Sequence, residues 1–238
     1  MKKPTPQNLL LIFMLFFLNF FTFLFFVSRG EAEELYKKFQ PAESSRQRET
    51  IEWSIVYMFN TNDQTKPRAL LIGDSICNAY QSAVRENLEE KVNVTYWASS
   101  KCVTDPQYFE ELNMVLSGNH YDVITFNNGL HSLASNREEW ETAYRQAVLF
   151  IQEKTPESKL LLVTSTPTEN PQDSEKSKEL GDYTKKIAEE FGLDVIDLYK
   201  VVNETDDKQP WSDGVHFKPP FVKLEGKTVA DAILKSIQ

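Results

Sequence analysis

Beyond residue 68, short apolar runs alternate with longer segments in which apolar side chains recur every three or four positions. The runs have the length and β-branched content of buried strands, and the longer segments have the period of amphipathic helices. The expected strands are residues 69–72, 92–97, 121–126, 160–164 and 193–198, and the expected helices are residues 78–90, 106–116, 137–154, 174–191 and 224–237. Regular alternation predicts an α/β fold, a three-layer α/β/α sandwich around a parallel five-stranded sheet. Ligands of such sheets bind at the carboxyl ends of the strands.

A different pattern occupies the N-terminus, where residues 9–27 are apolar except for Asn19 and Thr22. This run is long enough to span a bilayer and exceeds the usual core of a signal peptide, about 7–15 residues. Lys2 and Lys3 precede it and acidic residues follow, so the orientation rule places the rest of the chain outside the cytoplasm. We expect residues 1–30 to form a transmembrane signal anchor in the cell membrane. If the segment is cleaved, the protein is secreted.

Residues 31–67 are polar and charged, and we interpret them as a linker and edge segment. Within this segment, residues 51–59 carry enough apolar side chains to form a short helix or strand at the edge of the domain. The globular domain is then expected to span residues 68–238.

The net charge of this domain excludes one class of binding partner. The whole chain has a formal net charge of −9, yet residues 1–30 contain three basic groups and no acidic ones. The remainder therefore carries 23 basic and 35 acidic side chains. Such an acidic surface repels phosphate backbones, so we expect no nucleic-acid partner.

The first expected strand ends in Gly73-Asp74-Ser75, directly before a helical pattern. A serine at this point is exposed at the strand's carboxyl end and lies beside the free N–H groups of a helix start. Such a turn suits a nucleophile, although Asp and Ser are also common helix caps.

A second motif lies far downstream, in Trp211-Ser212-Asp213-Gly214-Val215-His216. An aspartate three residues before a histidine can hold the imidazole in one tautomer and stabilise its cation. With Ser75, this block resembles the SGNH (GDSL-like) hydrolases, over roughly residues 68 to 238. The resemblance implies a flavodoxin-like fold and a Ser-His-Asp mechanism, with Ser75 as nucleophile, His216 as general base and acid, and Asp213 as its orienting carboxylate.

The same resemblance implies an oxyanion hole made from the serine N–H, a backbone N–H after the second strand, and an asparagine side chain after the third. In this chain those positions fall on Ser75, on a group near Ser100, and on His131. The family's glycine is missing near Ser100, and histidine stands where the family has asparagine, with Asn127 and Asn128 as close alternatives. A neutral imidazole can donate one N–H, so His131 is a candidate donor.

The two cysteines, Cys77 and Cys102, have no metal-ligand spacing, and the three histidines are scattered. We therefore predict no metal site and no cofactor. Both cysteines are expected on loops at one edge of the sheet in an oxidising compartment, which makes a Cys77–Cys102 disulfide a hypothesis. Two buried thiols are the alternative.

Together these features predict an extracytoplasmic serine esterase. Its expected partner is an acylated, most plausibly acetylated, small molecule or polysaccharide of the cell envelope, and its N-terminal helix is expected in the membrane. Two alternatives stay open: an O-acyltransferase on the same scaffold, and a catalytically weak glycan-binding protein.

Overall fold

The computed structural model describes residues 35–205 and 209–237. The chain divides into two compact units, residues 1–38 and 39–238. Of the first unit, the structure describes a short 3-10 helix, η1 (Leu35–Lys38). The predicted transmembrane segment lies outside the described residues, and no helix within them is long and apolar enough to cross a membrane.

The second unit is built on a six-stranded sheet in the order β1-β3-β2-β4-β5-β6. Its strands are β1 (Ser54–Met58), β2 (Arg68–Gly73), β3 (Asn93–Ser99), β4 (Val123–Phe126), β5 (Lys159–Val163) and β6 (Asp194–Ile196). The last five are parallel, as the apolar runs predict. The first is antiparallel to β3, so the prediction of a purely parallel, five-stranded sheet was wrong. The sheet is mixed because residues 54–58 pair along the free edge of β3.

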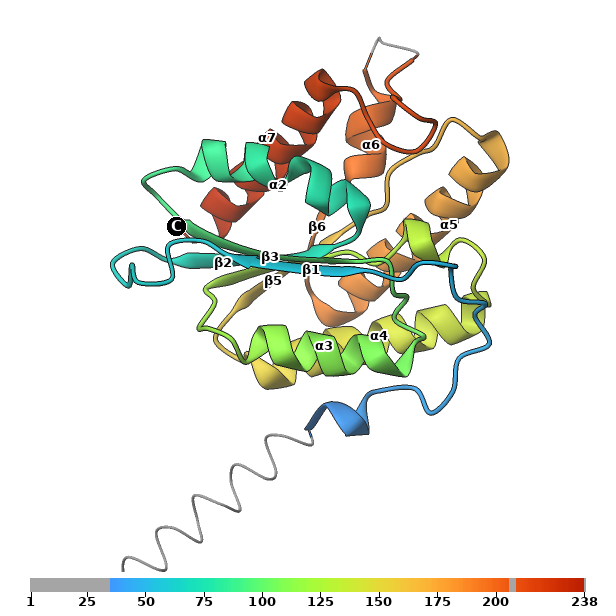
Figure 1. Cartoon of the computed structure of the whole chain (residues 1–238), viewed down its shortest axis with the longest axis horizontal. Coiled ribbons are helices and arrows are strands. Elements are labelled where there is room, and N and C mark those ends of the chain that lie inside the picture. The colour runs from blue at the N-terminus through green and yellow to red at the C-terminus, as the bar shows by residue number, and fades with distance from the viewer. Residues whose placement is uncertain (1–34, 206–208, 238) are drawn as a thin grey trace, which may run out of the picture. The chain divides into compact units, whose positions relative to one another are not determined.

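Helices cover both faces of the sheet and give the expected three layers (Figure 1). One face carries α2 (Ser75–Leu88), α6 (Leu198–Asn203) and α7 (Pro219–Ser236), and the other carries α3 (Pro106–Leu116), α4 (Arg137–Lys154) and α5 (Pro171–Phe191). The central strand β2 is completely buried, because it lies between β3 and β4 and is covered on both faces. The turn after β2 therefore lies in the middle of the sheet's carboxyl edge.

Helix ends follow local capping chemistry. Gly192 ends α5 in the left-handed conformation at φ +65°, as predicted for a glycine C-cap. Three helices begin earlier than the apolar pattern indicates: α2 at Ser75, α5 at Pro171 and α7 at Pro219. Proline is well suited to the first helical turn, where its missing N–H costs no hydrogen bond. In α5 the first turn is also polar, so apolar periodicity gave no sign of its start.

Candidate active site

The turn after β2 presents Ser75 at the first position of α2. Asp74 is the N-cap residue, and its Oδ1 accepts the backbone N–H of Ile76 at 3.0 Å. Gly73 allows the tight approach of strand to helix, because a Cβ at this position would lie 2.5 Å from Cβ of Cys77. The backbone N–H of Ser75 lies in the first helical turn, where N–H groups have no acceptor within the helix. Asp74 thus caps α2, and Ser75 lies beside the helix N-terminus.

The loop before α7 brings His216 to this serine. Ser75 Oγ lies 2.8 Å from His216 Nε2, and His216 Nδ1 lies 2.8 Å from Asp213 Oδ2. A bridge between Trp211 and Phe217 closes the base of the loop. The structure therefore brings together the three residues that the two sequence motifs predicted, although Ser75 and His216 are 141 positions apart in the chain. Their catalytic roles stay a prediction.

Asp213 is held by its own loop as well as by the imidazole. Its Oδ1 accepts the backbone N–H groups of Val215 at 3.1 Å and His216 at 2.8 Å. The turn needs Gly214, whose φ of +87° favours glycine. These hydrogen bonds, the His216 N–H first among them, lower the pKa of Asp213 to about 2. The carboxylate is therefore ionised throughout the pH range in which an imidazole titrates.

Substituting Asp213 by asparagine is expected to lower kcat about 100-fold. The reason is that the uncharged amide stabilises the imidazolium less and leaves its tautomer less well defined. The expected loss of kcat is smaller than in triads whose aspartate is buried, because the Asp213 side chain is 56 % exposed and water screens its charge. Steady-state hydrolysis of an aryl acetate measures the change. An unchanged kcat would contradict the proposed role of Asp213.

The loop after β3 does not offer the backbone donor predicted near Ser100. Ser100 N–H donates to Trp53 O at 3.1 Å, and its hydroxyl donates to Glu52 Oε2 at 2.7 Å. The next three backbone N–H groups are also engaged, those of Lys101, Cys102 and Val103, with Ser99 Oγ, Asp105 Oδ2 and Asn128 Oδ1 as their acceptors. The Ser100 donors are thus engaged by Trp53 and Glu52, directly before β1, and a role of Ser100 in an oxyanion hole stays a prediction.

His131 lies in η2 (Leu130–Ser132), the 3-10 turn after β4. Its Nδ1 lies 2.5 Å from Glu49 Oε1, and its ring meets the edge of Trp53. If Nδ1 carries the proton toward this carboxylate, the neutral ring has only an acceptor at Nε2. His131 can then donate to an oxyanion only in its protonated form. Its place in an oxyanion hole, like that of the Ser75 N–H, stays a prediction.

Asn128 is one of the two asparagines that the sequence offered as alternatives to His131. Its Oδ1 accepts the Val103 N–H at 3.0 Å and its Nδ2 donates to Lys101 O at 2.9 Å. The side chain thus joins the loop after β4 to the loop after β3, instead of facing a substrate. The available signal was the pair of asparagines directly after a buried strand, at the edge of the sheet where ligands bind.

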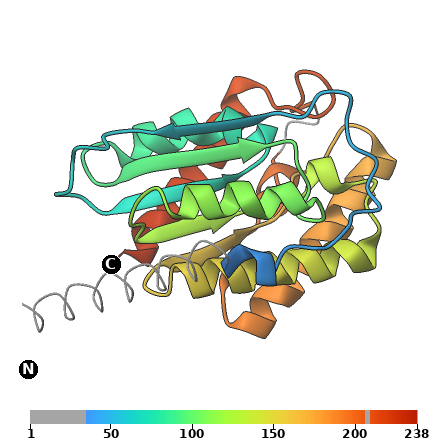
Figure 2. The same cartoon turned by 60° about the horizontal axis from the view of Figure 1, so that its bottom comes forward.

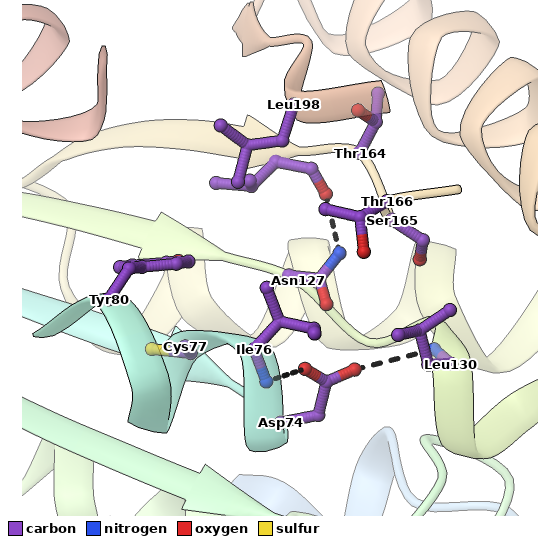
Figure 3. A pocket seen from close by; sticks show the side chains of 11 residues that line it. Asp74, Ile76, Cys77, Tyr80, Asn127, Leu130, Thr164, Ser165, Thr166 and Leu198 are labelled. Atoms are coloured by element: carbon purple, nitrogen blue, oxygen red, sulfur yellow. Dashed lines mark hydrogen bonds between the residues drawn. The ribbon is translucent and has the colours of Figure 1, made fainter. Parts of the chain in front are cut away.

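A small cavity lies behind the nucleophile turn (Figure 3). It is lined at the ends of β2, β4 and β5 by Asp74, Asn127, Leu130 and the stretch 163–166, together with side chains of α2 and α6. Asp74 Oδ2 accepts the Leu130 N–H at 3.3 Å across it, and Asn127 Nδ2 donates to Val163 O at 2.8 Å. These bonds fix the three strand ends relative to one another and so support the position of Ser75.

Cys77 and Cys102 are both free and buried, so the disulfide hypothesis was wrong. Cys77 belongs to α2 on one face of the sheet, and burial raises the pKa of its thiol to about 12. Cys102 lies in the loop that leads to α3 on the other face, where the Ser132 hydroxyl donates to its sulfur at 3.0 Å. Within the part of the chain that the structure describes, no three His, Cys, Asp or Glu side chains gather as metal ligands would.

No sequence-family model matches the chain, and no curated protein matches it by sequence. Solved structures do match. A carbohydrate acetylesterase from Sinorhizobium meliloti superposes with a TM-score of 0.59 at 15% identity, covering 71% of this chain and 99% of its own. An acetylxylan esterase from Geobacillus stearothermophilus gives 0.56 at 19% identity, with 72% and 94% covered. A member of the lipolytic G-D-S-L family from Veillonella parvula gives 0.60 at 16%, with 71% and 98% covered.

These neighbours share the α/β architecture over nearly their whole length, and the sequence motifs of this chain fall on its sheet edge where the fold presents ligands. The protein has the SGNH (GDSL-like) hydrolase fold.

Proposed function

We propose that the protein is a serine esterase that removes short acyl groups, above all acetyl, from a carbohydrate or cell-envelope polymer. The observation that carries the proposal is the chain of hydrogen bonds from Ser75 through His216 to Asp213, at the centre of the sheet's carboxyl edge. Similarity in fold to a carbohydrate acetylesterase and an acetylxylan esterase supports the choice of substrate class.

In the proposed reaction, His216 Nε2 takes the proton of Ser75 Oγ as the oxygen attacks the ester carbonyl. The resulting imidazolium is stabilised by Asp213, which is ionised at the pH of the reaction. His216 then gives the proton to the leaving alcohol, and an acyl-enzyme forms on Ser75. Water enters, His216 removes its proton, and the acid is released with the serine restored. The Ser75 N–H at the start of α2 would stabilise the oxyanion in both halves of the reaction.

We further propose that the reaction takes place outside the cytoplasm. The apolar run of residues 9–27, with two lysines before it and acidic residues after it, supports this location. The acidic character of the remaining chain suits a neutral or basic polymer better than a polyanion.

Release of acetate from an acetylated polysaccharide by the full-length protein tests the proposal. We expect acetate release from the polymer and faster turnover of aryl acetates than of aryl esters with long acyl chains, because the sequence after residue 68 has no long apolar stretch of the kind that forms a lipase lid. The same protein with Ser75 replaced by alanine is the control. Equal acetate release by the two proteins would contradict the proposed mechanism.

An O-acyltransferase would use the same nucleophile and pass the acyl group to a sugar hydroxyl instead of water. Product analysis with an oligosaccharide acceptor separates the two reactions. A glycan-binding protein without turnover is a second candidate, favoured by the engaged N–H groups of the loop after β3. Glycan binding with no acyl release from any ester would favour it.

A further inference from the structure

Residues 44–53, here called the strap, lie against the loops that follow β3 and β4 (Figure 2). Ser44 Oγ donates to Thr104 Oγ1 at 3.1 Å, and Trp53 N–H donates to Ser100 Oγ at 2.8 Å. The strap is therefore bonded at both of its ends to the loop after β3. It is more than the linker that its polar composition indicated.

Arg46 is the centre of these contacts. Its side chain is only 3 % exposed. The guanidinium donates to Asp105 Oδ2 at 2.8 Å, Glu52 Oε1 at 3.0 Å, Ser100 O at 3.1 Å and His131 O at 3.3 Å. One side chain of the strap thus bonds to the loop after β3 and to η2 after β4. A guanidinium suits this task because its donors form a rigid planar fork.

The Arg46 contacts are charge-compensated as well as numerous. Burial lowers the pKa of Arg46, but the neighbouring carboxylates of Asp105 and Glu52 outweigh this and raise it above its ordinary value. Asp105 is 1 % exposed, and its Oδ1 has no hydrogen-bond partner in the structure as described. Its Oδ2 accepts from Arg46 and from the Cys102 N–H, so Arg46 is the cationic partner of this buried carboxylate. A buried pair of this kind fixes geometry strongly, because breaking it leaves a buried charge without compensation.

The two loops that Arg46 joins flank the nucleophile turn. In the sheet, Gly73 of β2 pairs with Ala98 of β3, and Ile72 pairs with Phe126 of β4. Strand β2, which leads to Ser75, thus lies between the two strands that lead into these loops. The Leu130 N–H also donates to Asp74, the residue next to Ser75. A shift of either loop would change the space in which a substrate carbonyl meets the serine.

We propose that Arg46 is a positioning residue of the active site: its guanidinium holds the loop after β3 and the η2 turn at the separation that the reaction at Ser75 requires. This inference rests on the proposed esterase function. It makes the strap, which joins the N-terminal unit to the sheet, a part of the reaction centre. Glu49 of the strap also helps to hold the η2 turn, because its carboxylate bonds to the His131 ring.

Substituting lysine for Arg46 tests the proposal, because it keeps the charge and removes the fork. Arg68→Lys is the matched control. Arg68 is also buried, at 4 % exposed, and donates to Phe59 O and Asn60 O, both at 2.7 Å, but at the opposite end of the sheet. In the full-length protein we expect Arg46→Lys to lower kcat for an aryl acetate about 10- to 100-fold with KM changed less than threefold, as misplaced groups do. Arg68→Lys should keep kcat within threefold at a similar loss of Tm.

Hydrogen exchange of the backbone gives a readout that does not depend on turnover. Residues 99–105 and 129–135 should exchange faster in Arg46→Lys than in Arg68→Lys. If Arg46→Lys does not fold, the double variant Arg46→Met, Asp105→Asn removes both buried charges and is expected to show the same loss of kcat and the same faster exchange.

The proposal is overturned if Arg46→Lys, or the double variant in its place, keeps kcat within threefold of the Arg68→Lys value. It is equally overturned if the control loses as much kcat as the Arg46 variant. Should the unsubstituted protein hydrolyse no ester, the proposed function fails, and exchange alone decides the inference: faster exchange confined to the two loops supports the role of Arg46, and unchanged exchange removes it.

Discussion

Ser75→Ala is expected to lower kcat for an aryl acetate by about 10⁴- to 10⁶-fold, the loss seen when the nucleophile of a hydrogen-bonded triad is removed. The physical reason is the geometry of the site, because the Ser75 hydroxyl is the group that His216 Nε2 contacts, at 2.8 Å. Alanine leaves no hydroxyl at this position for His216 to deprotonate. Initial-rate measurements at saturating substrate on the full-length protein give the comparison.

Two controls make the Ser75 result specific. Ser174→Ala removes another serine from the first turn of a helix, α5, where its hydroxyl contacts Tyr199, and should keep kcat unchanged. The double variant Ser75→Ala, His216→Ala should be no slower than Ser75→Ala alone, because residues that act as one unit lose their effect together. Additive losses would mean that the two side chains act independently, which would contradict a shared proton transfer.

The fold could be predicted from the sequence where the local pattern of apolar residues reflects the burial of the element in the structure. Continuous apolar runs such as 69–72 and 160–163 are buried on both faces, and parallel strands covered by helices demand that composition. Strand β1 differs because it lies at the edge, where its side chains are only partly buried. Its pattern was compatible with either a helix or a strand. Its antiparallel pairing depends on a neighbour 43 residues away, Ala98 opposite Ile55, and not on any local signal.

In the candidate site, too, some residues could be predicted from local sequence and others could not. Ser75 and the Asp213, His216 pair stand in short motifs, so local sequence was sufficient to select them. The Arg46 network joins residues up to 85 positions apart, and nothing in a polar linker marks the one arginine that becomes buried. The disulfide hypothesis failed for a related reason: membership of the same sheet edge did not reveal that Cys77 and Cys102 lie on opposite faces.

Glu225 of α7 is expected to make the free energy of unfolding depend strongly on pH. Its side chain is completely buried, and neither carboxyl oxygen has a hydrogen-bond partner among the described residues. Helices α2 and α7 pack closely beside it, since a Cβ at Gly226 would lie 2.4 Å from Cβ of Ala83 in α2. Burial first, and then the charge of Asp74, raise the pKa of Glu225 from 4.5 to about 8. At neutral pH the folded protein therefore holds a proton that the unfolded chain has released.

The sign of the pH dependence follows from this difference. Below pH 4.5 both states bind the proton, and the stabilisation is fully present. Between 4.5 and about 8 only the folded state binds it, so the free energy of unfolding falls as pH rises. The loss contributed by this one group is on the order of 3–5 kcal/mol at pH 8.5, at about 1.4 kcal/mol for each pH unit. The neighbouring Cys77 and Tyr80 lower the free energy of unfolding mainly above this range, because their ordinary pKa values are 9.0 and 10.0 and the fall begins where the unfolded chain loses its proton.

Glu225→Gln should remove that contribution. The amide is uncharged at every pH and nearly the same size, so its stability should lie within about 1 kcal/mol of the unsubstituted protein at pH 5 and exceed it by about 3–5 kcal/mol at pH 8.5. Urea unfolding at a series of pH values gives both free energies, and Glu86→Gln, which neutralises an exposed carboxylate of α2, is the control that should leave the pH profile unchanged. Parallel pH profiles for Glu225→Gln and the unsubstituted protein would mean that Glu225 is ionised inside the fold. In that case α2 and α7 must part enough at neutral pH to hydrate the carboxylate, and the helix that follows His216 would be looser than its packing indicates.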